Sequence, residues 1–85
     1  MDRSLLKFFW NCGDNDIIEF AIMRARLNRL EIEVIRLMLD ECRTQEEIAE
    51  QMEYSTRKVQ EIWYSASTKL LSIPWVYAYA VELKR

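Results

Sequence analysis

Polar side chains with hydrogen-bonding groups recur on one side of the stretch "STRKVQEIWYSASTKL", residues 55–70. Gln60, Glu61 and Tyr64 follow Arg57 by three, four and seven residues, which places all four on one face of a helix. The guanidinium has paired N–H donors, the Gln amide a donor and an acceptor, and the carboxylate two acceptor oxygens. This face has the chemistry of hydrogen-bond recognition, although a solvated helix surface would have the same composition.

No covalent or metal chemistry is indicated elsewhere in the chain. It contains no His, and no carboxylate pair, Gly-rich loop or nucleophile beside a base is recognisable. The two cysteines, Cys12 and Cys42, are too few for a zinc site, and we expect reduced thiols packed as small hydrophobic groups. The sequence thus predicts a protein that is not an enzyme and that has no catalytic site, metal or cofactor.

The charge is unevenly distributed along the chain. The net charge is −2, but residues 1–53 contain 7 Lys or Arg against 12 Asp or Glu, whereas residues 54–85 contain 5 against 2. Because a nucleic acid attracts positive charge, any surface that binds one is expected in residues 54–85.

The elements that position these residues are predicted to be helices. One Gly and one Pro in 85 residues leave few helix breakers, and apolar side chains recur at helical spacing. We predict a single all-α domain, residues 1–85, with five to six helices. The first helix is expected at about residues 2–12, and the second runs from a cap at Asp14, Asn15 or Asp16 to about residue 26. The third runs from Asn28 to Cys42 or Arg43, the fourth is short and starts at Thr44, the fifth runs from Ser55 through Leu70, and residues 74–85 form a further helix or a tail. The side chains expected to be buried are Leu5, Leu6, Phe9, Ile18, Ala21, Ile22, Ala25, Leu30, Val34, Leu37, Met38, Ile48, Ala49, Met52, Val59, Ile62, Trp63, Ala66 and Leu70.

Residues 44–63 have the features of a helix-turn-helix. Thr44, with Glu47 three residues later, forms a capping box at the start of the first helix, and Ser55 is a cap for the second. The small side chain of Ala49 suits a close crossing of the two helices. The apolar residues spaced to hold the second helix on the first are Val59 and Ile62.

A longer pattern surrounds this motif. It consists of Leu27, Glu31, Val34, Ile35, Leu37, Glu47, Ile48, Ala49, Ser55, Val59, Ala66, Lys69 and Leu70. In this pattern the segment 27–70, which is 44 of the 85 residues, resembles region 4 of bacterial sigma factors and, more distantly, the LuxR-type helix-turn-helix. We therefore expect a sigma-region-4-like helix-turn-helix in residues 27–71, N-terminal helices in 1–26, and a C-terminal helix or tail in 72–85.

The resemblance implies a sequence-specific DNA-binding regulator of transcription, of a kind common in phages and other mobile elements. In the family the second helix enters the major groove of double-stranded DNA. Arg57 would then donate to guanine, Gln60 would pair with adenine, and Glu61 would accept from cytosine. The residues implied to face bases are Ser55, Thr56, Arg57, Gln60, Glu61 and Tyr64, and those implied to contact phosphates are Arg43, Thr44, Lys58 and Lys69.

Three positions depart from the family pattern. Glu53 occupies a turn position usually held by Gly, and it must adopt an unfavourable backbone conformation or shift the turn. Lys58 stands where Thr is common, and Ile62 where a basic residue is common. The carboxylate of Glu61 and the acidic helix at residues 44–52 should weaken affinity for DNA.

A protein-binding module is the alternative. Region 4 of sigma factors also contacts a polymerase subunit, so this acidic version would keep the fold without DNA binding. It would then bind RNA polymerase or act as a phage-type inhibitor of a host complex. Three Trp, four Tyr and three Phe are many for 85 residues, and the terminal groups "LLKFFW" and "WVYAY" belong either to the core or to a homodimer surface. No stretch is apolar over the length of a membrane span, and no secretion signal is recognisable, so we expect a cytoplasmic protein without membrane contact.

Overall fold

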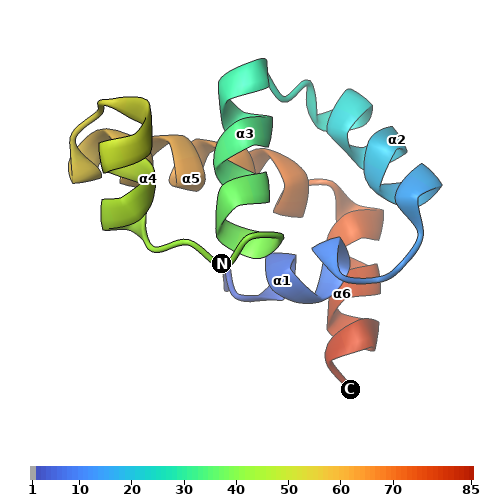
Figure 1. Ribbon diagram of the computed structural model, residues 1–85. Coiled ribbons are helices and arrows are strands. Elements are labelled where there is room, and N and C mark those ends of the chain that lie inside the picture. The colour runs from blue at the N-terminus through green and yellow to red at the C-terminus, as the bar shows by residue number, and fades with distance from the viewer. Residues whose placement is uncertain (1) are drawn as a thin grey trace. The chain divides into compact units, whose positions relative to one another are not determined.

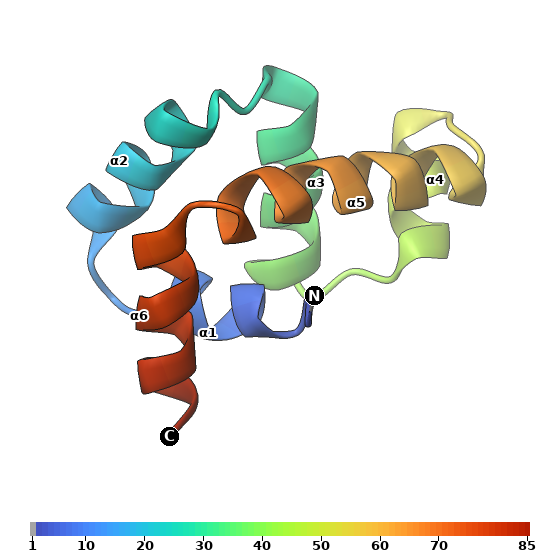
Figure 2. The ribbon, with the colours of Figure 1, turned by 180° about the vertical axis from the view of Figure 1, so that it is seen from behind.

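The computed structural model describes residues 2–85, and the elements in this range are all helices, which confirms the predicted all-α class (Figures 1 and 2). Each helix overlaps the range expected for it. Residues 74–84 form a helix rather than a tail. The six helices are α1 (Leu5–Trp10), α2 (Asn15–Ala25), α3 (Arg29–Leu39), α4 (Gln45–Met52), α5 (Thr56–Leu71) and α6 (Pro74–Lys84).

The chain divides into two compact units. The terminal unit consists of residues 2–27 and 67–85, and the central unit consists of residues 28–66. The terminal unit contains α1, α2, α6 and the end of α5, whereas the central unit contains α3, α4 and the first part of α5. The central unit lies inside residues 27–71, the range in which a helix-turn-helix is expected. A single domain over residues 1–85 stays a prediction.

In the terminal unit, α1 packs against α6 through aromatic side chains. Phe9 is fully buried, and its ring lies edge-on to the rings of Trp75 and Tyr79, with centroids 6.1 Å apart in both pairs. Pro74 occupies the first turn of α6, where its missing N–H costs no helix hydrogen bond. Much of the aromatic content of the two terminal segments is therefore used within the chain.

Polar contacts also join the two ends of the chain. Arg3 Nη2 donates to Thr68 Oγ1 at 3.0 Å, and Lys84 Nζ lies 3.7 Å from Asp2 Oδ2. Hydrogen bonds from the hydroxyl and the backbone N–H of Ser4 lower the pKa of Asp2, and the charge of Lys84 lowers it further. Asp2 is thus ionised at neutral pH and keeps its attraction for Lys84.

α2 has one buried side and one exposed side. Asp14 caps its start by accepting hydrogen bonds from two backbone N–H groups of the first turn, at 3.1 and 3.2 Å. Phe20 and Met23 are 55% and 74% exposed, although both are large and apolar. The fully buried residues of α2 are Ala21 and Ile22.

Some side chains do not lie where the sequence pattern placed them. Cys42 is exposed, so the prediction that it packs as a small hydrophobic group is wrong. It follows α3 with φ of 53°, and the Arg43 N–H donates to the Leu37 carbonyl oxygen at 3.0 Å, so the backbone reverses here and the thiol faces solvent. Cys12 is half-buried. The expected core residues that are only half-buried are Ile18, Ala25, Leu30, Met38, Met52 and Trp63.

The core of the central unit is shared by three helices. Asn28 and Glu31 form a capping box at the start of α3. Trp63 was expected to be buried, but it is half-buried and packs against the edge of this core. The buried cluster takes two residues from each helix: Val34 and Leu37, Ile48 and Ala49, and Val59 and Ile62. α5 is therefore fixed by α3 and α4 along one side only.

Candidate nucleic-acid interface

The turn between α4 and α5 is built around a left-handed residue. Glu53 has φ of 59° and ψ of 39°, a region that L-residues other than Asn and Asp rarely adopt. The Tyr54 N–H donates to the Ala49 carbonyl oxygen at 2.9 Å and closes the end of α4. Of the two outcomes expected for Glu53, the unfavourable backbone conformation is the one observed.

Replacing Glu53 by Gly should raise the free energy of unfolding by about 0.5–1 kcal/mol. The left-handed conformation costs an L-residue roughly 1–2 kcal/mol, and part of the gain is lost because Gly has more freedom in the unfolded chain. Thermal or denaturant unfolding measures the difference. Glu50→Gly, inside α4, is the matched control and should destabilise. A Glu53→Gly protein less stable than the parent would contradict this account of the turn.

Both helices of the motif begin with the predicted caps. Thr44 Oγ1 accepts from the Glu47 N–H at 3.2 Å, and the Thr44 N–H donates to Glu47 Oε1 at 2.9 Å. At the start of α5, Ser55 Oγ accepts from the Lys58 N–H at 3.1 Å. The hydrogen bonds from Thr44 lower the pKa of Glu47 below its ordinary value of 4.5, and the charge of Arg43 acts in the same direction. α4 therefore keeps this negative charge at neutral pH.

The polar side of α5 is accessible to solvent. The side chain of Arg57 is 88% exposed, and its Nε lies 3.5 Å from Glu61 Oε1. Water screens such an exposed pair, so both groups stay available to another partner. Tyr64 is also exposed. Gln60 differs, since its Nε2 donates to Gln45 Oε1 at 3.0 Å and must release or share that bond to contact a base.

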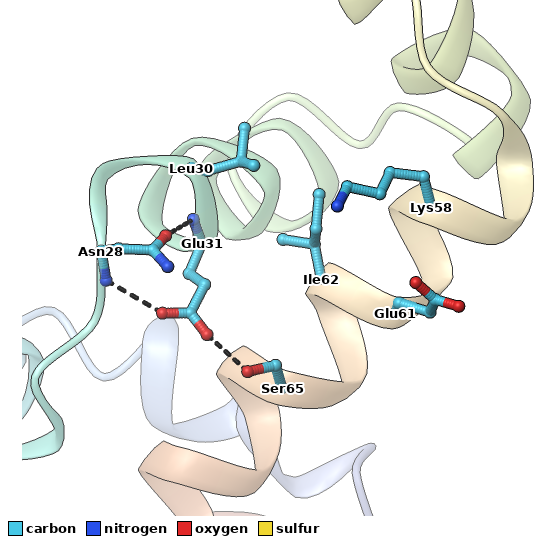
Figure 3. A pocket seen from close by; sticks show the side chains of 7 residues that line it. All are labelled: Asn28, Leu30, Glu31, Lys58, Glu61, Ile62 and Ser65. Carbon is cyan, nitrogen blue, oxygen red and sulfur yellow. Dashed lines mark hydrogen bonds between the residues drawn. The ribbon is translucent and has the colours of Figure 1, made fainter.

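Lys58 lies beside a hollow of about 220 Å³ between α3 and α5. The carboxylate of Glu31 is only 3% exposed there, and it accepts from the Ser65 hydroxyl at 2.6 Å and from the Asn28 N–H at 2.9 Å (Figure 3). Figure 3 shows the amino group of Lys58 directed toward Ile62 rather than outward. Lys58 is exposed, so its amino group remains accessible to solvent.

Nine of the ten residues implied to contact DNA lie in the central unit. Arg43 precedes α4, and its Nε is 3.2 Å from Glu41 Oε1. Thr56 is half-buried in the first turn of α5. Lys69, in the last turn of α5, belongs to the terminal unit. Nine of the implied contacts thus fall within residues 43–64 of the central unit.

Two polar residues of this region were not among the predicted contacts. Gln45 binds Gln60 across 15 positions of sequence, and Ser65 binds Glu31 across 34. Neither pair has a local signature. Glu31 is part of the family pattern, but its capping of α3 is a sufficient reason for a Glu at that position. Its bond to Ser65 could therefore not be predicted.

The central unit is acidic. It contains five Lys or Arg and nine Asp or Glu, a net charge of −4, whereas the terminal unit contains seven and five, a net charge of +2. The positive charges of residues 54–85 are therefore divided between the two units. The central unit has only Arg57 and Lys58 of them, together with the acidic Glu61. Any affinity for a DNA backbone would therefore depend on local positive groups rather than on net charge.

Comparisons with protein-family models, with curated proteins and with solved structures find no match to this chain. Within residues 2–85, no group of three or more His, Cys, Asp or Glu side chains is placed to hold a metal ion. The helices in this range lack the combined length and apolar character that a bilayer crossing requires.

Proposed function

We propose that the central unit is a sigma-region-4-like helix-turn-helix that binds double-stranded DNA through α5 and regulates transcription. The observation that supports this best is the division of α5 into two faces. Val59 and Ile62 are buried in the core with α3 and α4, whereas Arg57, Glu61 and Tyr64 are exposed. A helix held on one side and polar on the other is what enters the major groove in helix-turn-helix proteins.

The exposed groups match the edges of bases. Arg57 can donate to O6 and N7 of guanine, and Glu61 can accept from N4 of cytosine. Binding to such a site would break the Arg57–Glu61 ion pair. A guanine and a cytosine would then replace the lost contact with one hydrogen-bonding partner for each side chain. The start of α5, capped by Ser55, adds backbone N–H groups and the positive end of the helix dipole, which attract a phosphate.

Arg57→Ala should weaken binding to the preferred duplex by about 1–3 kcal/mol and relax the preference at one base pair. The reason is the loss of a bidentate contact to a base. The preferred duplex is first selected from a random pool by the parent protein. Binding titrations against that duplex and a scrambled one, at two salt concentrations, then measure both quantities.

Two further replacements separate base contacts from phosphate contacts. Lys58→Ala should weaken binding to the selected and scrambled duplexes alike and reduce the salt dependence by about one phosphate contact. Glu61→Gln should strengthen binding to the scrambled duplex, because it removes a repulsive charge. If the parent has no salt-dependent affinity for any duplex, and Arg57, Lys58 and Lys69 can all be replaced without effect, the DNA proposal fails.

We infer a protein-binding module as the second candidate, because the central unit has a net charge of −4. An acidic surface that repels DNA can attract a basic surface on RNA polymerase or another protein. In α4 the exposed acids are Glu46, Glu47 and Glu50. Replacing these three by Gln should strengthen binding to DNA under the first proposal and weaken capture of purified RNA polymerase under the second.

A further inference from the structure

The outer face of α2 is an apolar surface bounded by opposite charges. Phe20 and Met23 form its exposed centre. Asp16 lies four residues before Phe20 and Arg24 four residues after it, and all are exposed. Each charge is thus about 6 Å along the helix axis from the central ring. From its N-cap to its C-cap, α2 presents the acids Asp14, Asp16 and Glu19, then the apolar Phe20 and Met23, and then the basic Arg24 and Arg26.

Hollows lie on both sides of the Phe20 ring. The first, of about 360 Å³, is lined by Asp16, Ile17 and Trp75 together with Phe20, and the rings of Phe20 and Trp75 are 5.9 Å apart. The second, of about 260 Å³, lies on the positive side and is lined by Phe20, Met23, Arg24 and Arg26. Projecting side chains and hollows therefore alternate on one surface, which is the relief that an identical surface can fit.

We propose that this surface joins two copies of the chain into a homodimer, with their α2 helices antiparallel about a two-fold axis at Phe20. The axis sets Asp16 of each copy opposite Arg24 of the other and brings the two Phe20 rings together. In a parallel arrangement, like charges would face each other. The order of charges on α2 is thus complementary to itself in the antiparallel arrangement, as a two-fold interface requires.

The arrangement gives the homodimer expected from the terminal aromatic groups a defined surface. Phe9 and Trp10 are buried within the terminal unit and are not available to a second copy. Trp75, from the C-terminal group, is 37% exposed and lines the hollow beside Phe20. The proposal does not depend on DNA binding, because each residue in it belongs to the terminal unit.

Sedimentation of the full chain over a range of concentrations tests the dimer. A small interface with charges at its edge should have a dissociation constant of roughly 1–100 μM. Replacing Phe20 and Met23 together by Ser should weaken association at least about tenfold, because it removes the apolar centre. A parent chain that stays monomeric up to about ten times that range overturns the proposal.

Charge reversal tests the antiparallel geometry. Asp16→Arg sets two Arg side chains together at both ends of the interface, and Arg24→Asp sets two Asp side chains together. Each variant alone should associate at least about tenfold more weakly than the parent. An equimolar mixture should form a heterodimer of near-parental affinity, since every facing pair is then opposite in charge. Two variants that merely failed to fold would not restore each other.

Glu46→Arg is the matched control for Asp16→Arg. Both replace an acid in the first turn of a helix and change the net charge equally, but Glu46 lies in the central unit. The Glu46→Arg protein should sediment as the parent does. A dimer that persists in both reversal variants, or a mixture that stays monomeric although each variant melts cooperatively, overturns the assignment to α2.

Discussion

Replacing Phe9 by Ala should lower the free energy of unfolding by about 3–5 kcal/mol. The Phe9 ring is fully buried in the terminal unit and meets Trp75 and Tyr79 edge-on. Truncation removes two aromatic contacts and leaves a cavity between α1 and α6 that the helices close only in part. Small domains are stable by only about 5–15 kcal/mol, so the loss is a large share of the total.

Urea unfolding followed by circular dichroism measures this loss. Phe8→Ala is the matched control, because it removes the same side chain from the next residue of α1, which is half-buried. We expect a clearly smaller loss for Phe8→Ala. Equal unfolding midpoints for the two variants would contradict the central place of the Phe9 ring in the packing of α1 on α6.

The helices could be predicted because their signals are local. The capping boxes at Asn28 and Thr44 each depend on a Glu three residues later, and the start of α6 depends on Pro74 alone. The packing of α1 on α6 could not be predicted, since it joins segments at opposite ends of the chain. The aromatic residues there indicated burial or a dimer, and nothing in the sequence said which helix would cover Phe9.

In the candidate interface, too, only the features that depend on local sequence could be predicted. Helical spacing separated the buried Val59 and Ile62 from the exposed Arg57. The departure from Gly at Glu53 left two outcomes open, and only the structure shows which one occurs. The direction of the Lys58 side chain was not predictable. It depends on a hollow between α3 and α5 that exists only after these helices pack. The net negative charge of the central unit could not be predicted either, because the boundaries of that unit are defined by tertiary contacts.

Replacing Glu31 by Ala should lower the free energy of unfolding by about 2–4 kcal/mol. The buried carboxylate accepts hydrogen bonds from the Asn28 N–H and the Ser65 hydroxyl, and it thereby holds the start of α3 against the middle of α5. Ala removes both acceptors, leaves the two donors without these partners, and enlarges the adjacent hollow. Since α5 is the proposed DNA-reading helix, affinity for selected and scrambled duplexes should fall together.

Unfolding of Glu31→Ala, Ser65→Ala and the double variant forms a cycle that isolates the Glu31–Ser65 bond. Ser65→Ala alone should cost about 1 kcal/mol, and the double variant should cost less than the sum, because the contact is lost only once. Glu31→Gln is the shape-matched control and should retain most of the stability, since the amide oxygen can still accept one of the two bonds. Additive losses in the cycle, or a Glu31→Ala protein that unfolds at the parental midpoint, would show that the carboxylate does not hold α5 in place.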